Sequence, residues 1–373
     1  MPAPGPSMRQ HTRLQNANKF KLGLFGMNCS GSVATTAPER WNAGWPESRK
    51  AAQLADAAGI EFLLPIARWL GYGGTTDRHG TTFETLSWAS AMLASTDEIV
   101  VFATVHAPLV HPAFAAKSCA TADHVGAGRL GLNVVSGWNV GEFAMFGAHL
   151  LPHDERYRYT EEWLTVVKRI WLETEPFDFS GQHFKLTNVS GKPKPWGDGR
   201  PVLMSAGSSV QGREFAARHV DCLFMVITDE GKLAEEIAEI HKGNTGSEKL
   251  GVYASGHLIS RATPKETKDY YHYLVHEKGD WGAAETAIAK RLEGESRSMP
   301  PERIMSMKER FISGGGTFPV VGSYDEAAAT LKRLSDAGLD GMALAVVNYV
   351  NEVPIIRDEI IPRLERLGVR KAA

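Results

Sequence analysis

The stretch Ile99–Val135, IVVFATVHAPLVHPAFAAKSCATADHVGAGRLGLNVV, contains the repeat from which the fold is built. Its two ends, Ile99–Thr104 and Arg129–Val135, are short apolar runs with β-branched residues, and each predicts a strand. Pro112–His124 lies between them and predicts a helix that begins on a proline. Because no hairpin signal joins the two strands, we expect them to run parallel, connected by the helix.

The same alternation of strand and helix continues in both directions along the chain. Further strands are predicted at Lys21–Met27, Phe62–Ile66, Pro201–Ser205, Cys222–Ile227, Gly251–Ile259 and Met342–Val347. Further helices are predicted at Pro46–Ala58, Phe83–Ala94, Arg156–Leu172, Val210–His219 and Val353–Leu367. Eight such repeats predict an α/β fold of the closed (β/α)8 type, the TIM barrel. An open doubly wound sheet is the alternative, but the first strand-to-helix turn lacks the GxGxxG phosphate-binding sequence.

Two segments interrupt this pattern, and the chain begins with a polar, proline-containing stretch. Phe177–Lys194 alternates polar and apolar residues around a Ser-Gly pair, which predicts an inserted antiparallel hairpin. His276–Thr317 is long, charged and glycine-rich, and we interpret it as a mobile lid over the substrate; a solvated loop with one or two helices is the alternative. We expect residues 1–18 to be a flexible tail and residues 19–373 to form a single barrel domain.

Composition narrows the range of functions. Lys and Arg total 41 against 43 Asp and Glu, so nothing in the charge favours nucleic acid or an anionic membrane as a partner. No apolar run is long enough to span a bilayer. Cys29, Cys119 and Cys222 are far apart, which favours a reducing cytoplasm over a disulfide framework. No His or Cys spacing predicts a metal site.

Polar residues at strand ends are the first candidates for chemistry in such a barrel. Thr104 and Asn133 end neighbouring predicted strands, so their side chains are expected to converge above the barrel mouth. Each of them also has a simpler interpretation, in which it satisfies a nearby backbone group.

The tract Gly128–Trp171, GRLGLNVVSGWNVGEFAMFGAHLLPHDERYRYTEEWLTVVKRIW, resembles the bacterial-luciferase-like flavin monooxygenases. The similar features are the NVVSGW strand end, a glutamate four residues after the tryptophan and the HDERY segment before a helix. The stretches IARWLGYGG and AGSS agree with the same family. The resemblance covers about Lys21 to Leu367 and is strongest to the dimethyl sulfone, alkanesulfonate and pyrimidine monooxygenases.

This resemblance implies a binding site for flavin mononucleotide (FMN). The side chains it implies are Ala67 and Arg68 at the isoalloxazine edge, Asn133 and Glu142 at the ring or ribityl chain, and Arg156, Tyr157 and Ser209 at the phosphate. Independently, Arg156 offers a charged fork, Tyr157 a phenolic donor, and Ser209 opens a predicted helix whose free N–H groups favour an anion. The alternative for Arg156 and Tyr157 is a solvated helix terminus.

The resemblance also implies an activity. Relatives are two-component enzymes, so reduced FMN is expected from a separate NAD(P)H:flavin reductase, with O2 as co-substrate. Thr104 and Asn133 match positions that line the oxygen pocket in the pyrimidine branch, which is associated with oxygen addition at flavin N5; addition at C4a stays open. His257, on the seventh predicted strand, matches a histidine of the alkanesulfonate branch, which implies a role in orienting substrate or carrying a proton; a structural histidine of the barrel is the alternative. The alternatives are a deazaflavin-dependent dehydrogenase and a non-catalytic flavin-binding relative. Relatives form dimers or tetramers, and the same is expected here.

The sequence departs from the alkanesulfonate enzymes at the loop that engages their sulfonate. Phe311–Gly322, FISGGGTFPVVG, has no arginine within its glycine run. Burying an anion without a partner is unfavourable. We therefore expect a small neutral substrate, such as a sulfone or an amide-like heterocycle.

Overall fold

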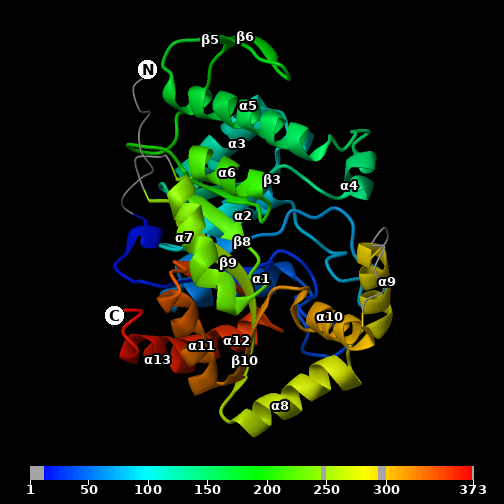
Figure 1. Ribbon diagram of the computed structural model, residues 1–373. Coiled ribbons are helices and arrows are strands. Elements are labelled where there is room, and N and C mark those ends of the chain that lie inside the picture. The colour runs from blue at the N-terminus through cyan, green and yellow to red at the C-terminus, as the bar shows by residue number, and fades with distance from the viewer. Residues whose placement is uncertain (1–11, 245–248, 293–299, 372–373) are drawn as a thin grey trace.

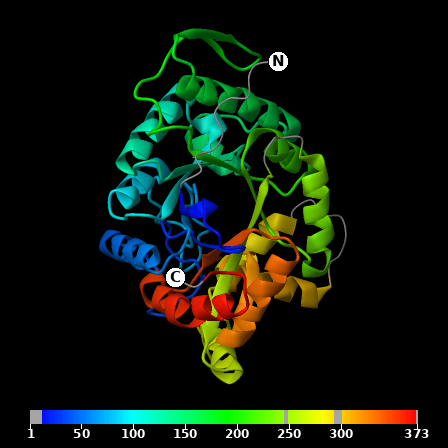
Figure 2. The same cartoon turned by 90° about the vertical axis from the view of Figure 1, so that its left-hand side faces the viewer.

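A closed barrel of parallel strands forms the centre of the protein, as seen in a computed structural model that describes residues 12–244, 249–292 and 300–371. Nine strands form one sheet in the order β10-β9-β11-β1-β2-β3-β4-β7-β8, and a further pairing of β8 with β9 closes the ring. Helices surround the strands in both views (Figures 1 and 2). The predicted (β/α)8 barrel is confirmed, and the open doubly wound sheet is excluded.

Each strand of the ring runs parallel to its neighbours. The ring strands are β1 (Lys21–Phe25), β2 (Phe62–Leu64), β3 (Val100–His106), β4 (Leu130–Val135), β7 (Val202–Ala206), β8 (Cys222–Met225), β9 (Gly251–Arg261) and β11 (Gly341–Ala345). Bulky side chains such as Phe62, Phe102 and Met204 fill the interior, so the barrel is a packed core and not a pore.

One strand was not predicted. β10 (Phe318–Ser323) pairs with Gly256–Arg261 of β9, beyond the segment Gly251–Ala254 that pairs with β8. Since β9 is longer than β8, it leaves a free edge at its C-terminal half, and β10 occupies that edge. β10 contains the exposed Pro319, a residue tolerated only in an edge strand.

The helices of the outer layer follow the strands and bury their apolar faces against the barrel. They are α1 (Trp45–Ala57), α2 (Thr85–Leu93), α3 (Pro112–Val125), α5 (His153–Leu172), α6 (Val210–His219), α7 (Leu233–Gly243), α11 (Tyr324–Asp336), α12 (Tyr349–Ile355) and α13 (Ile361–Arg366). Helix α8 (Pro264–His272) lies instead against the ends of β9 and β10 and contributes no side chain to the main hydrophobic core. The short helix α4 (Val140–Met145) follows β4 before α5 begins.

Two insertions extend from the barrel. An antiparallel hairpin of β5 (Phe177–Ser180) and β6 (Lys185–Val189) follows α5, within the segment predicted to contain one. The described part of the predicted lid is largely helical, with α9 (Trp281–Leu292) and α10 (Pro301–Gly314) side by side (Figure 1). Both helices contribute buried side chains to a second hydrophobic cluster, which also contains Val33 of the loop after β1. That the segment moves as a lid stays a prediction.

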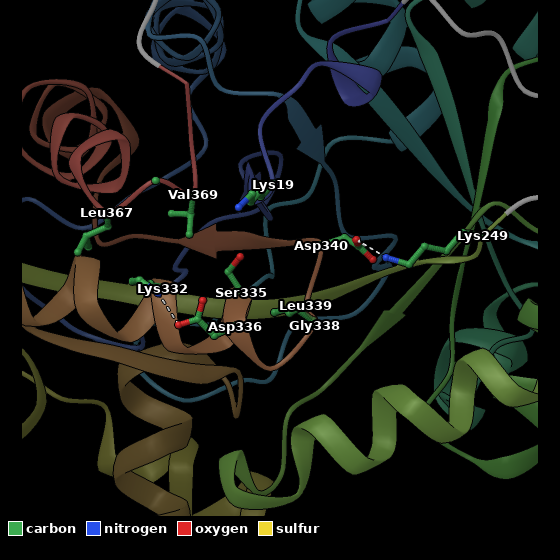
Figure 3. Close-up of a pocket in the computed structure, with 11 residues that line it drawn as sticks. Lys19, Lys249, Lys332, Ser335, Asp336, Gly338, Leu339, Asp340, Leu367 and Val369 are labelled. Carbon is green, nitrogen blue, oxygen red and sulfur yellow. Dashed lines mark hydrogen bonds and ion pairs between the residues drawn. The ribbon is translucent and has the colours of Figure 1, made fainter.

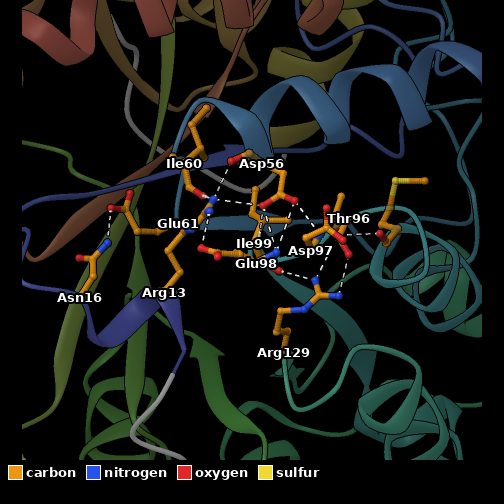
Figure 4. A network of polar contacts seen from close by, with 12 residues as sticks. Arg13, Asn16, Asp56, Ile60, Glu61, Thr96, Asp97, Glu98, Ile99 and Arg129 are labelled. Carbon is orange, nitrogen blue, oxygen red and sulfur yellow. Dashed lines mark hydrogen bonds and ion pairs between the residues drawn. The ribbon is translucent and has the colours of Figure 1, made fainter. Parts of the chain in front are cut away.

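The N-terminal segment is folded where the structure describes it. Residues 1–11 of the predicted flexible tail lie outside the described residues, but residues 12–18 pack against the base of the barrel. Leu14 is buried among the side chains of the barrel interior. Arg13 forms ion pairs with Asp56 and Glu98 (Figure 4). The prediction of a flexible tail is therefore wrong for residues 12–18, because the buried side chain of Leu14 and the ion pairs of Arg13 fix this segment to the barrel.

Among the described residues, no helix combines the length and the apolar character needed to cross a membrane.

Candidate active site

The polar side chains of the barrel interior gather at the C-terminal ends of the strands. Thr104 and His106 lie on β3, Asn133 on β4 and His257 on β9, and all four are buried. Because active sites of (β/α)8 barrels lie at this end, these residues mark the candidate active site.

Thr104 and Asn133 are brought together as predicted. They are register partners on adjacent strands, and the Asn133 amide nitrogen Nδ2 donates to the Thr104 hydroxyl at 3.2 Å. The Thr104 hydroxyl in turn donates to the Pro65 carbonyl at 2.6 Å. The Asn133 oxygen Oδ1 is buried and has no hydrogen-bond partner among the described residues. These two successive hydrogen bonds fix the orientation of the Asn133 amide. Its oxygen Oδ1 is therefore left to accept a hydrogen bond from an N–H or O–H group of a ligand.

Glu142 ties the loop after β2 to helix α4. Its oxygen Oε1 accepts hydrogen bonds from the backbone N–H groups of Trp69 and Leu70 at 3.0 and 3.3 Å. The same oxygen forms an ion pair of 3.3 Å with Arg68, and both side chains are buried. In this structure Glu142 therefore positions Arg68, and the contact of Glu142 with flavin stays a prediction.

Arg68 and its neighbour Ala67 lie in the loop that leaves β2, at the barrel mouth. The Arg68 nitrogen Nη2 donates to the Tyr72 hydroxyl at 2.6 Å, and the guanidinium carbon lies 5.0 Å from the centre of the Trp138 ring. Its nitrogen Nε is buried without a partner among the described residues. Glu142 and Tyr72 therefore fix the Arg68 guanidinium at the barrel mouth, and its nitrogen Nε is left available for a ligand.

Two of the three predicted phosphate ligands meet, and the third is their neighbour in the chain. The Tyr157 hydroxyl, near the start of α5, lies 3.4 Å from the hydroxyl of Ser209, which caps α6 by accepting from the Gly212 N–H at 3.1 Å. Arg156, on the same turn as Tyr157, donates through Nη1 to the Gly137 carbonyl and has an unpartnered buried Nε within the described chain.

Glycines keep this corner free of side chains. A Cβ on Gly207 would lie 2.9 Å from the Cα of Gly212, and a Cβ on Gly212 would lie 2.7 Å from the Tyr157 hydroxyl. The result is a narrow cradle at a helix N-terminus, where free backbone N–H groups attract anions. That this corner holds a phosphate group stays a prediction.

His257 stands apart from these groups, at the far side of the mouth. Its nitrogen Nδ1 lies 2.9 Å from the Thr317 hydroxyl, and Nε2 has no partner among the described residues. Burial lowers the pKa of His257 to about 3, with further lowering by Arg310 and Arg78. Burial likewise lowers the pKa of His106 to about 4. Both rings are therefore neutral at physiological pH.

Arg78 was missed by the sequence analysis. It lies between β2 and α2, is buried beside Tyr72 and Phe311, and acts electrostatically on His257. Nothing in its local sequence, TTDRHG, distinguishes it from an exposed loop arginine.

A cavity of about 330 Å³ lies away from these residues, at the opposite end of the barrel (Figure 3). It is lined by residues that precede strands, including Lys249 before β9 and Asp340 before β11. The Asp340 carboxylate accepts from the Val252 N–H at 2.8 Å and pairs with Lys249 at 3.1 Å, so it is engaged in the fold. The N-terminal face of such barrels serves stability, and we assign no chemistry to this cavity. In the described ranges, no cluster of three or more His, Cys, Asp or Glu side chains is arranged to bind a metal.

The buried neutral histidines predict that the protein loses stability in acid. The pKa values of His106 and His257 lie below the value of about 6.5 expected in the unfolded chain, so the unfolded state binds more protons. The free energy of unfolding is therefore at its full value, as far as these histidines are concerned, above about pH 6.5. It falls as the pH is lowered towards 4 for His106 and towards 3 for His257, by up to about 1.4 kcal/mol per pH unit for each histidine.

Urea unfolding at several pH values below neutrality measures this slope. His106→Gln should make the slope shallower, whereas His272→Gln, at an exposed position, should leave it unchanged. Equal slopes for wild type and His106→Gln would contradict the assignment.

Residues 20–341 match the model of the family described as luciferase-like monooxygenase. The chain is 30% identical to the FMNH2-dependent dimethylsulfone monooxygenase of Pseudomonas fluorescens (strain Pf0-1), over 95% of this chain and 97% of that protein. It is also 30% identical to pyrimidine monooxygenase RutA of Acinetobacter baylyi, over 92% of this chain and 94% of that protein. The crystal structure of DmoA from Hyphomicrobium sulfonivorans superimposes with a TM-score of 0.83, at 18% identity and over 95% and 90% of the two chains, a likeness of fold alone.

Proposed function

The chain belongs to the luciferase-like monooxygenase family, and we propose that it uses reduced FMN and O2 to oxygenate a small organic molecule. The observation that carries this proposal is the meeting of the Tyr157 and Ser209 hydroxyls at the glycine-lined start of α6, with the partly unpartnered Arg156 one residue before Tyr157. The dimethylsulfone relative is named for its dependence on FMNH2, in agreement with a monophosphate site.

Reduced FMN supplies the electrons that O2 needs in order to react with a closed-shell organic molecule. In this proposal the cradle holds the phosphate, and the unpartnered buried nitrogen of Arg156 gains an acceptor. The free oxygen Oδ1 of Asn133 accepts a hydrogen bond from a donor of the ring. The Arg68 cation stabilises negative charge at the barrel mouth. Each of these roles satisfies a group that is otherwise buried without a partner.

The substrate that we propose is small and neutral, a sulfone or an amide-like heterocycle such as a pyrimidine. Two curated relatives are named for substrates of these kinds, dimethylsulfone and pyrimidine. We further propose that a separate NAD(P)H:flavin reductase supplies the FMNH2, and that the enzyme works in the cytoplasm.

We propose that the enzyme is a homodimer or homotetramer. Helices α2 and α3 pack against each other on the outside of the barrel, and on α3 the side chain of Phe114 is 64% exposed. An exposed phenylalanine on a helix is a suitable subunit contact. The mass in solution, from light scattering, tests this proposal; the mass of one chain would refute it.

Anaerobic titration tests the proposed function. The protein is titrated with oxidised FMN and with FMNH2, and the reduced complex is then mixed with O2 while flavin spectra are recorded. We expect tighter binding of FMNH2 and a transient flavin species before reoxidation. If neither redox form binds, the proposal is wrong, and binding of a reduced deazaflavin would instead favour the dehydrogenase alternative.

Arg156→Met is expected to weaken FMNH2 binding by about 30- to 140-fold, because one charge-assisted interaction with phosphate contributes about 2–3 kcal/mol. The matched control is Arg158→Met, two residues along the same helix at an exposed position. Equal affinities of the two variants, measured by anaerobic titration, would place the phosphate elsewhere.

A further inference from the structure

Arg78 is a buried cation with no acidic partner in the part of the chain that the structure describes. Its exposed fraction is 5%, its nitrogen Nε has no hydrogen-bond partner among the described residues, and Nη2 reaches only the Ser32 carbonyl at 3.3 Å. The rings of Tyr72 and Phe311 lie 5.7 and 5.6 Å from its guanidinium carbon. Burial is the main cause that lowers the pKa of Arg78, and the other groups acting on it are Tyr72, Arg68, Cys29 and Tyr349, none of them a carboxylate.

Two acidic side chains that contact the loop of Arg78 form hydrogen bonds to backbone groups instead. Asp77, the preceding residue, accepts from the Gly73 N–H at 3.0 Å. Asp280 accepts from the Thr76 N–H at 2.7 Å and from the Ala283 N–H at 3.0 Å. Both carboxylates therefore stabilise backbone and leave the guanidinium uncompensated.

The backbone holds Arg78 in place at some conformational cost. Its two neighbours, Asp77 and His79, have positive φ angles of 37° and 63°, which are unfavourable for residues other than glycine. The His79 N–H donates to the Ser30 carbonyl at 2.9 Å, which fastens this turn to the loop after β1. Strain of this kind is concentrated at functional sites.

The glycine run Gly314–Gly316 lies against both Arg78 and His257. A Cβ on Gly315 would lie 2.2 Å from Nη2 of Arg78, and a Cβ on Gly314 would lie 2.2 Å from Nδ1 of His257. The sequence analysis favoured a neutral substrate because this run contains no arginine. In the folded protein, Arg78 from the loop between β2 and α2 lies against this glycine run.

We infer that Arg78 binds an oxygen atom of the substrate that carries a large partial negative charge, the sulfonyl oxygen of a sulfone or the carbonyl oxygen of an amide-like heterocycle. This inference rests on the proposed function and names the polar group that the substrate must carry. A guanidinium presents a planar fork of N–H donors to two such oxygens. A neutral sulfone satisfies its donors, and a monoanionic analogue also compensates its charge, so such analogues should bind more tightly than neutral molecules of the same size and can serve as probes.

The test compares wild type, Arg78→Met, Arg78→Lys and Arg40→Met. Arg40 is the matched control, since it contacts the same loop through the Thr76 carbonyl but is only half-buried. The probes are dimethyl sulfone, methanesulfinate and methanesulfonate, added by calorimetry to FMNH2-loaded and to cofactor-free protein.

We expect at least one probe to bind wild type and Arg40→Met, with binding at least about 30-fold weaker in Arg78→Met and partly retained in Arg78→Lys. FMNH2 affinity should be equal in all four proteins. Equal probe binding in wild type and Arg78→Met, or no probe binding to any of them, would overturn the inference. Failure of FMNH2 to bind wild type would instead overturn the proposed function, and the cofactor-free titrations would still decide the role of Arg78.

Thermal unfolding separates a binding role from a structural one. Because the guanidinium has no acidic partner, Arg78→Met should unfold within about 2 °C of wild type or at a higher temperature. Methanesulfinate should raise the midpoint of wild type but not that of Arg78→Met. A midpoint lower by more than about 5 °C in the variant would show that Arg78 stabilises the fold, and would overturn the inference.

Discussion

Thr104→Val is expected to lower the rate of product formation by about 100-fold or more while FMNH2 affinity stays within about threefold of wild type. Valine keeps the shape of threonine but removes the hydroxyl that accepts from Asn133 and donates to the Pro65 carbonyl. The Asn133 amide then loses its fixed orientation, and the polar pocket beside the proposed flavin site loses both its hydroxyl and its aligned acceptor. Product formation, coupling to FMNH2 oxidation and FMNH2 affinity are measured together.

The control for this prediction is Thr96→Val, at the opposite end of the barrel. The Thr96 hydroxyl is also buried, donates to the Met92 carbonyl at 2.8 Å and accepts from Arg129 at 3.2 Å. Both variants lose two hydrogen bonds, so they should lose similar stability, but only Thr104→Val should lose turnover. If turnover and coupling are unchanged in Thr104→Val, the hydroxyl has no part in oxygenation.

The barrel was predictable because its signal is local and repeated. In the unit of β3, α3 and β4, apolar strand residues and an intervening helix occur within a short stretch, and the parallel pairing follows from that connection. The same register places Thr104 opposite Asn133, so their hydrogen bond was within reach of sequence reasoning.

The features that sequence reasoning missed depend on contacts between distant segments. β10 exists because β9 extends past β8 and leaves a free edge, which the glycine-rich sequence before β10 does not reveal. Arg78 matters because the run Gly314–Gly316 packs on it from the far end of α10. Leu14 enters the barrel interior from a segment with a polar composition that predicted a tail. In each case the decisive partner lies far away in the chain.

The ion pair of Glu61 and Arg370 is another such contact, and its loss should have the largest effect on stability. The two side chains are 0% and 4% exposed and are 2.7 Å apart. Glu61 also accepts from the Leu22 N–H at 2.8 Å, and Arg370 donates to the Gly59 carbonyl at 2.9 Å. This group joins the C-terminus to β1 and to the start of β2.

Arg370→Met is therefore expected to lower the free energy of unfolding by about 3–5 kcal/mol, because it leaves a buried carboxylate without its cation. Urea denaturation measures the loss. Arg357→Met removes an exposed ion pair with Asp358 and should change the same free energy by less than about 1 kcal/mol. Adding Glu61→Gln to Arg370→Met should lower stability by less than the sum of the two single effects, since the pair is already broken. A loss below about 1 kcal/mol in Arg370→Met would mean that water reaches Glu61 and that the C-terminus is not held by this pair.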